Sequence, residues 1–209
     1  KNSEDTTDYY PKRFGIDFYH TYKEDLKLLA DAGFKTFRTS LDWSRIFPNG
    51  DDEKPNEAAL KHYDEMIDYM IKLGIEPIIT MNHYETPINI TLKYVGWPNK
   101  AVIPMFEKFG KVLLDRFGDR VKYWIVVNQI NMVQIEPWLS VGVASDQYDN
   151  MQEALYQAMH NQFVAAAAIQ KYAKSLHNPN LHIGTMVADG TVYPASSKPD
   201  DIVLAMQQN

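Results

Sequence analysis

The sequence predicts an α/β fold built on a parallel sheet, because apolar segments alternate with segments of helical periodicity along the chain. The strand segments are apolar on both faces, which is typical of buried parallel strands. Two architectures fit this pattern, an open doubly wound sheet and a (β/α)8 barrel. The expected strands are 34–40, 75–82, 121–127 and 181–187.

The helices between these strands are predicted from the spacing of their apolar residues and from their ends. The segment 22–32 is amphipathic and stops at Gly33. The segment 56–74 begins at Asn56, a good N-cap residue, and ends at Gly74.

Two later segments show the same signals. The segment 99–117 has apolar residues in helical register and is followed by Gly118. The segment 149–176 is long and rich in alanine, and Asp149 and Gln152 have the spacing of a capping box at its start. Both segments are therefore expected to be helices.

Composition limits the class of protein. The 209 residues suffice for one domain with a sizeable core, and the net charge of −6 comes without a run of like charges. This balance argues against nucleic acid or an anionic membrane as a partner. No apolar run approaches the roughly 18 residues of a membrane span, and the N-terminus has no signal-peptide pattern. We therefore expect a soluble, cytoplasmic protein.

No metal or organic cofactor is predicted. The chain has no cysteine, and its six histidines are scattered without the spacing of metal ligands. The segment "RTSLDWSR" (38–45) follows the first strand and contains no glycine, which weakens a nucleotide- or phosphate-loop interpretation.

Polar side chains occur where each predicted strand ends. One such residue alone is more often a turn residue, a structural histidine or an ion-pair partner than part of a site. Their recurrence matters, because the carboxyl ends of parallel strands open on one face, where barrel enzymes place their sites. A shared polar pocket is therefore predicted from Arg38, Ser40, Asn82, His83, Asn128, Gln129 and Asp189.

Several motifs resemble glycoside hydrolase family 1. The stretch "VKYWIVVNQINMV" resembles the segment that carries the family's Asn-Glu motif, and "YVGWPNK" its Gly-Trp-x-Asn stretch. The Asn-Glu-Ile-Asn form of that motif, followed by a "YPxxxxPxD" element, is similar to bacterial 6-phospho-β-glucosidases. The matching segments, in the family's order, are 17–50, 81–87, 94–100, 121–133 and 193–201.

The resemblance implies a (β/α)8 TIM barrel of retaining β-glycosidases. Residues 1–209 are expected to form a single, incomplete domain that covers about half of the barrel. The family's nucleophile glutamate and its phosphate-gripping residues are expected beyond residue 209. Glu85 and Glu136 are the only acids near the relevant strand ends, and we expect both to be loop residues.

The resemblance also implies roles for individual side chains. His83 and Asn128 would bind sugar hydroxyls, with Asn128 near the 2-hydroxyl. Arg38 would orient the nucleophile, and Trp97 would support the loop beside the pocket. A wall on the aglycone side would come from Tyr84, Met132 and Trp138.

Gln129 departs from the family pattern, because it stands where the family has its acid/base glutamate. A retaining glycosidase needs two carboxyl groups roughly 5–5.5 Å apart. Glutamine can form hydrogen bonds but cannot give or take the proton, and the loss should cost about 10²–10⁴-fold on a poor leaving group. Three explanations of this exchange are open. It is deliberate and made to trap a substrate complex, it is natural as in plant myrosinases, or it marks a decayed enzyme. The surrounding motifs argue against a myrosinase itself.

The function expected from these observations is hydrolysis of 6-phospho-β-D-glucosides by a retaining two-carboxylate mechanism, impaired at Gln129. One alternative is a β-glucosidase that acts on unphosphorylated sugars, and another is a non-catalytic sugar-binding protein. A half-barrel also leaves two sheet edges unpaired, so pairing with another copy of the chain stays open.

Overall fold

The computed structural model describes residues 15–208, and the expectation of no signal peptide concerns residues outside this range. The core of the fold is one parallel sheet whose strands lie side by side in chain order, β1-β2-β3-β4. The four strands are β1 (Thr36–Ser40), β2 (Glu76–Asn82), β3 (Tyr123–Val127) and β4 (His182–Gly184). All four predicted strands are therefore confirmed, although β4 is shorter than expected.

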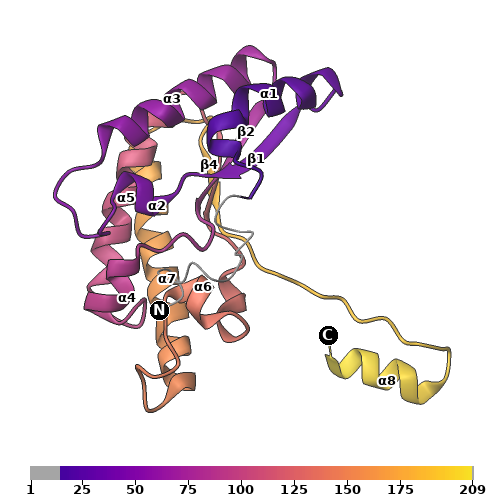
Figure 1. Cartoon of the computed structure of the whole chain (residues 1–209). Helices are drawn as coiled ribbons and strands as arrows, with labels where there is room; N and C mark the ends of the chain where they lie inside the picture. The colour runs from indigo at the N-terminus through magenta and orange to yellow at the C-terminus, as the bar shows by residue number, and fades with distance from the viewer. Residues whose placement is uncertain (1–14, 209) are drawn as a thin grey trace, which may run out of the picture.

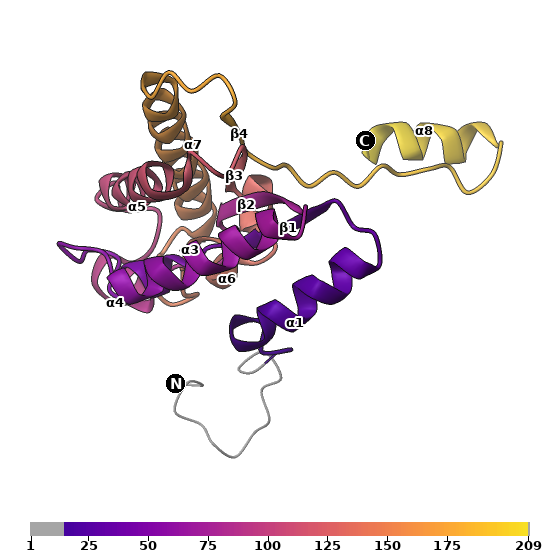
Figure 2. The same cartoon turned by 90° about the horizontal axis from the view of Figure 1, so that it is seen from above.

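The predicted helices are confirmed as well, and they follow one another around the outside of the sheet (Figures 1 and 2). They are α1 (Phe18–Asp31), α3 (Glu57–Lys72), α5 (Val102–Phe117) and α7 (Met151–Ser175), and one more long helix, α8 (Pro199–Gln208), follows β4. The last of them, α8, lies apart from the others at the end of an extended segment.

The order of the strands decides between the two architectures. A doubly wound sheet reverses its strand order at one point and carries helices on both faces. Here the order never reverses, and α3, α5 and α7 all lie on the outer side of the curved sheet (Figure 2). The structure is therefore a partial (β/α)8 barrel.

The two faces of the sheet differ in character. The outer face supplies buried apolar side chains to the core, among them Ile79, Met81, Trp124 and Val126. The expectation that every strand is buried on both faces was wrong, since no residue of β1 is fully buried and the ends of β4 are exposed. β1 and β4 are the two edge strands of the sheet, so each pairs with only one neighbouring strand.

Both ends of α3 agree with the capping residues predicted from the sequence. The side chain of Asn56 accepts hydrogen bonds from the backbone N–H groups of Ala58 and Ala59, so the predicted N-cap of α3 is confirmed. Gly74 has a φ of 74°, the left-handed conformation that favours glycine after a helix.

The predicted cap of α7 was wrong by one residue. The cap is Asn150, whose side-chain oxygen accepts a hydrogen bond from the backbone N–H of Glu153 at 3.2 Å. The Asn150 side-chain nitrogen in turn donates to the Glu153 carboxylate at 3.2 Å. Asp149 and Gln152 have the same spacing in sequence, but the first helical residue is Met151, so only Asn150 occupies the cap position.

Four short helices in the connecting segments were not predicted. They hold too few residues to show helical periodicity, and all four lie between the end of a strand and the next long helix. They are α2 (Trp43–Ile46), α4 (Ile88–Tyr94), the 3-10 helix η2 (Ile130–Gln134) and α6 (Pro137–Val141).

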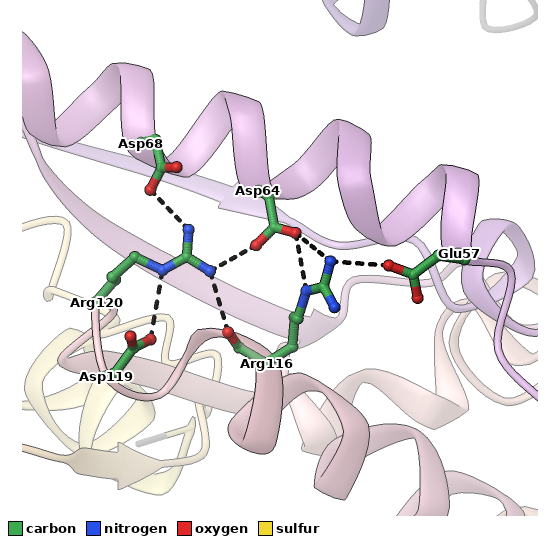
Figure 3. A network of polar contacts seen from close by, with 6 residues as sticks. All are labelled: Glu57, Asp64, Asp68, Arg116, Asp119 and Arg120. Atoms are coloured by element: carbon green, nitrogen blue, oxygen red, sulfur yellow. Dashed lines mark hydrogen bonds and ion pairs between the residues drawn. The ribbon is translucent and has the colours of Figure 1, made fainter.

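A network of charged side chains joins α3 to α5 on the outside of the barrel (Figure 3). Arg120 donates to Asp64 at 2.5 Å and to Asp68 at 2.6 Å, and Arg116 bonds to Asp64 and Glu57 at 2.8 Å each. These guanidinium groups hold the pKa of the Asp64 carboxyl below its usual value, against the opposing effect of burial. The network fixes how two neighbouring outer helices lie on the sheet.

No helix formed by residues 15–208 combines the length and the apolar character that crossing a bilayer requires.

Candidate active site at the carboxyl ends of the strands

The polar side chains that end the strands do come together. Arg38 lies on β1 opposite Ile78, Asn82 ends β2 opposite Val127, and Asn128 directly follows β3. The backbone N–H of Asn128 continues the ladder by donating to the Asn82 carbonyl at 2.9 Å. Arg38, Asn128 and Gln129 of the predicted cluster therefore form one polar surface that side-chain hydrogen bonds join.

Arg38 links three strands of this surface. Its Nε donates to the Thr80 hydroxyl on β2 at 3.0 Å, and its Nη2 donates to the Asn128 side-chain oxygen at 2.6 Å. Thr80 and Asn128 are buried, at 0% and 3% exposure. The guanidinium thus fixes the orientation of the Asn128 amide, because arginine can only donate and must face its oxygen.

Gln129 follows directly and turns the chain out of the strand. Its φ of 43° is left-handed, and its backbone carbonyl accepts from the N–H of Met132 at the start of η2. The side-chain oxygen accepts hydrogen bonds from the Tyr84 hydroxyl at 2.5 Å and from the Asn128 side-chain nitrogen at 3.2 Å. The side chain is partly exposed, so it faces the open side of the site.

The turn after β2 is held by a carboxylate. Glu85 accepts from the Ser40 hydroxyl at 2.5 Å with one oxygen and from the His83 backbone N–H at 2.8 Å with the other. Burial raises the pKa of the Glu85 carboxyl above its ordinary value, and the two hydrogen bonds oppose that shift. Glu85 is a loop residue as expected, but it also ties the turn to the end of β1.

His83 lies at the start of this turn with an exposed side chain. Partial desolvation and, to a lesser extent, the positive charge of Arg38 lower the pKa of its imidazole. The ring is therefore neutral at pH 7, with one nitrogen that donates and one that accepts. A neutral imidazole of this kind can bind a hydroxyl group in either sense.

The residues predicted for the walls are less closely joined to this cluster. Met132 is half-buried on η2, and the Trp138 side chain on α6 is 50% exposed beside a cavity of about 420 Å³. Trp97 is fully buried against Trp43 and Phe106, so its side chain cannot touch a substrate. Its backbone N–H donates to the Val141 carbonyl at 3.0 Å, which places it under the segment that carries Trp138.

The fourth strand contributes structure rather than a site residue. The Asn131 side chain forms paired hydrogen bonds with the backbone of Ala188, at 2.8 Å each, and so holds the segment after β4 against η2. Asp189 follows this anchor and is exposed.

Two contacts of the candidate site were not predicted from the sequence. Thr80, the partner of Arg38, lies inside an apolar strand and carries no motif of its own. The Glu85 bridge to Ser40 joins residues 45 positions apart, so no local pattern reveals it. The one usable signal for Thr80 was its place two residues before Asn82, on the same face of β2. Within residues 15–208, no three acidic or histidine side chains gather as a metal site would require.

The chain is similar to known glycosidases. The chain is 47% identical over 196 residues to a 6-phospho-β-glucosidase of Clostridium longisporum, which covers 94% of the chain and 41% of that protein. It is 46% identical over 193 residues to the aryl-phospho-β-D-glucosidase BglH of Bacillus subtilis, covering 92% and 41%. The chain thus spans about two fifths of the length of these curated relatives.

Among solved structures, the fold matches a rice β-glucosidase with a TM-score of 0.82 and 30% identity, over 93% of this chain and 43% of that one. That structure is of a Glu-to-Gln mutant in a covalent complex with glucose. The model of the family described as "Glycosyl hydrolase family 1" matches residues 1–209. The chain therefore belongs to glycosyl hydrolase family 1.

Proposed function

We propose that the protein to which this chain belongs hydrolyses 6-phospho-β-D-glucosides, with Gln129 at the acid/base position and the nucleophile outside residues 1–209. The observation that supports it is the joined Arg38–Asn128–Gln129 cluster at the strand ends. It occurs in a chain that is 46–47% identical to two phospho-β-glucosidases but 30% identical to the rice β-glucosidase.

The chemistry of a retaining glycosidase divides the work between two carboxyl groups. One attacks the anomeric carbon as the glycosidic bond breaks, and the other protonates the leaving oxygen and later deprotonates the attacking water. In this proposal the chain binds the sugar and holds the acid/base position. Asn128 and His83 meet sugar hydroxyls, and Arg38 keeps the Asn128 amide in one orientation.

Gln129 should weaken the protonation step and leave binding largely intact. An amide occupies nearly the same volume as a carboxyl group but has no proton to transfer. We expect turnover to fall about 10²–10⁴-fold on poor leaving groups and much less on activated aryl groups, which leave without protonation.

The test is Gln129→Glu in the full-length polypeptide, assayed on a phospho-glucoside with a sugar aglycone and on one with an activated aryl aglycone. The expected result is a rise in kcat of about 10²-fold or more on the first substrate and a smaller rise on the second. Gln134→Glu, an exposed exchange at the end of the short helix η2 that follows Gln129, is the matched control. Equal turnover in the two variants would show that position 129 is not the acid/base position.

The phosphate requirement needs its own comparison. Matched aryl β-glucosides with and without a 6-phosphate should differ strongly in kcat/KM in favour of the phosphorylated one. A preference for the unphosphorylated substrate would instead support a β-glucosidase.

A second candidate function follows from the amide itself. A protein with Asn128 and Gln129 joined after β3, and with His83 after β2, can bind a sugar without turning it over. Saturable binding of a phospho-glucoside with no release of an activated aryl group would support this non-catalytic role.

The intact mass of the purified protein decides which assay applies. A protein near 24.1 kDa would lack the proposed nucleophile, whereas one about twice as large can contain it.

A further inference from the structure

We propose that Tyr84 is a positioning residue that orients the side chain at position 129 by donating a hydrogen bond to its oxygen. The inference rests on the proposed function, in which residue 129 stands at the acid/base position. The Tyr84 hydroxyl lies 2.5 Å from the Gln129 side-chain oxygen.

A chain of donors determines which end of the Gln129 amide faces Tyr84. Arg38 can only donate, so the Asn128 group that it contacts at 2.6 Å is the oxygen. The other end of the Asn128 amide is then a donor, and the Gln129 atom 3.2 Å from it must be an acceptor. The same oxygen faces the Tyr84 hydroxyl, which therefore acts as the donor.

This arrangement leaves the nitrogen of Gln129 directed away from both contacts. Within residues 15–208 that nitrogen has no hydrogen-bond partner, and the side chain is partly exposed. Gln129 therefore presents an N–H donor to the open side of the site. Such a donor can bind a glycosidic oxygen but cannot protonate it.

The backbone on both sides of this contact is constrained. Tyr84 has a φ of 78° and Gln129 a φ of 43°, left-handed values that non-glycine residues adopt only at a cost in free energy. Residues keep strained conformations only where their surroundings hold them. The Tyr84 backbone N–H donates to the Asn82 side-chain oxygen at 3.2 Å, and Glu85 ties the same turn to Ser40.

The consequence can be measured with a carboxyl group at position 129. A hydroxyl that donates to an ionised carboxylate favours the charged form and lowers its pKa. In the Gln129→Glu protein, adding Tyr84→Phe should therefore raise the pKa of the introduced carboxyl by about one unit or more, since hydrogen bonds to charged groups contribute about 1.5–3 kcal/mol.

The experiment is a pH titration of side-chain carboxyl groups by carbon-13 NMR in the full-length polypeptide. The introduced carboxyl is identified as the resonance absent from the parent protein. Tyr172→Phe is the matched control, because the Tyr172 hydroxyl also bonds to a carboxylate, that of Asp115 at 2.5 Å, but on the outer helices. The pKa at position 129 should move with Tyr84→Phe and stay constant with Tyr172→Phe.

A pKa that stays constant with Tyr84→Phe would overturn the proposal. Replacing Tyr84 by 3-fluorotyrosine gives a second test that hardly changes the shape of the side chain. Its more acidic hydroxyl is a stronger donor, so the pKa at position 129 should fall. Neither titration needs turnover, so a shift in an inactive Gln129→Glu protein would contradict only the proposed function. An active protein without a shift would contradict only the role of Tyr84.

Discussion

Arg38 and Asn128 are 90 positions apart in the chain, yet the guanidinium of one donates to the side-chain oxygen of the other at 2.6 Å. The contact crosses the intervening strand β2, where the same guanidinium also donates to Thr80 at 3.0 Å. One side chain thus joins β1 and β2 to the residue that follows β3, at the end of the sheet where the proposed site lies.

Arg38→Lys should therefore lower the free energy of unfolding as well as sugar binding. Lysine keeps the charge but lacks the planar fork that reaches two partners in different directions. We expect a loss of about 1–2 kcal/mol in urea unfolding, the range of one to two hydrogen bonds. Lys171→Arg, an exposed exchange of the same two residue types on α7, should change the free energy of unfolding by less than about 0.5 kcal/mol. Equal effects of the two exchanges would mean that the fork of Arg38 is unimportant.

The His83 pKa predicts a pH dependence with a definite sign. Burial and the nearby Arg38 lower the pKa in the folded state, so the unfolded chain binds the proton more tightly. This contribution to stability is present above the unfolded pKa of about 6.5 and is lost as the pH falls through the lower folded pKa.

His83→Asn should remove that loss. Urea unfolding measured at a series of pH values from 7 to 4 should show a shallower decline for the variant than for the parent protein. His160→Asn, on the exposed side of α7, serves as the control exchange. Parallel curves for parent and His83→Asn would contradict the prediction.

Gly110 marks a close approach of α5 to α7. A Cβ atom added there would lie 2.5 Å from the Cδ1 atom of Ile169. Alanine favours a helix over glycine by about 1 kcal/mol, but overpacking a core costs about 1–3 kcal/mol. Gly110→Ala should therefore destabilise the protein, whereas Gly184→Ala, with open space around its Cβ position, should not.

A second substitution tests whether this clash is the cause. Ile169→Val removes the atom nearest to the added methyl group. Thermal unfolding of the double variant should show less destabilisation than the sum of the two single variants. Simple additivity would place the cost of Gly110→Ala elsewhere.

The cap of α7 distinguishes Asn150 from Asp149. Asn150→Ala removes both hydrogen bonds with Glu153 and should cost about 1 kcal/mol. Asp149→Ala removes neither of them, so its effect should be smaller. Denaturant midpoints of the two variants give the comparison, and a larger effect at Asp149 would favour the capping box expected from the sequence.

The network of Figure 3 should contribute stability that salt weakens. Arg120→Ala breaks its contacts with Asp64 and Asp68 and should lower the free energy of unfolding by about 1 kcal/mol at low salt. The loss should shrink in 1 M salt, where charges are screened within roughly 3 Å. Lys27→Ala breaks a single exposed pair with Asp31 and should have a smaller effect at either salt concentration. A loss that does not change with salt would point to packing of the Arg120 side chain instead.

The sequence by itself determined the alternation of strands and helices, the positions of all four strands and the polar residues at their ends. These features depend on local patterns, such as apolar periodicity and the glycine after α3, which act within one element. The family motifs also pointed to the barrel, and the family assignment confirms them. The shift of the α7 cap from Asp149 to Asn150 shows the limit, since two equal spacings differ only in where the helix begins.

The tertiary structure decided how the strand ends act together. The Arg38–Asn128, Ser40–Glu85 and Tyr84–Gln129 contacts join residues 90, 45 and 45 positions apart, so no local pattern contains them. They depend on the register of parallel strands and on two left-handed turns, which set where each side chain points. Gln129 illustrates the difference: the sequence shows that an amide follows β3, and the fold decides that the oxygen of this amide faces the Tyr84 hydroxyl.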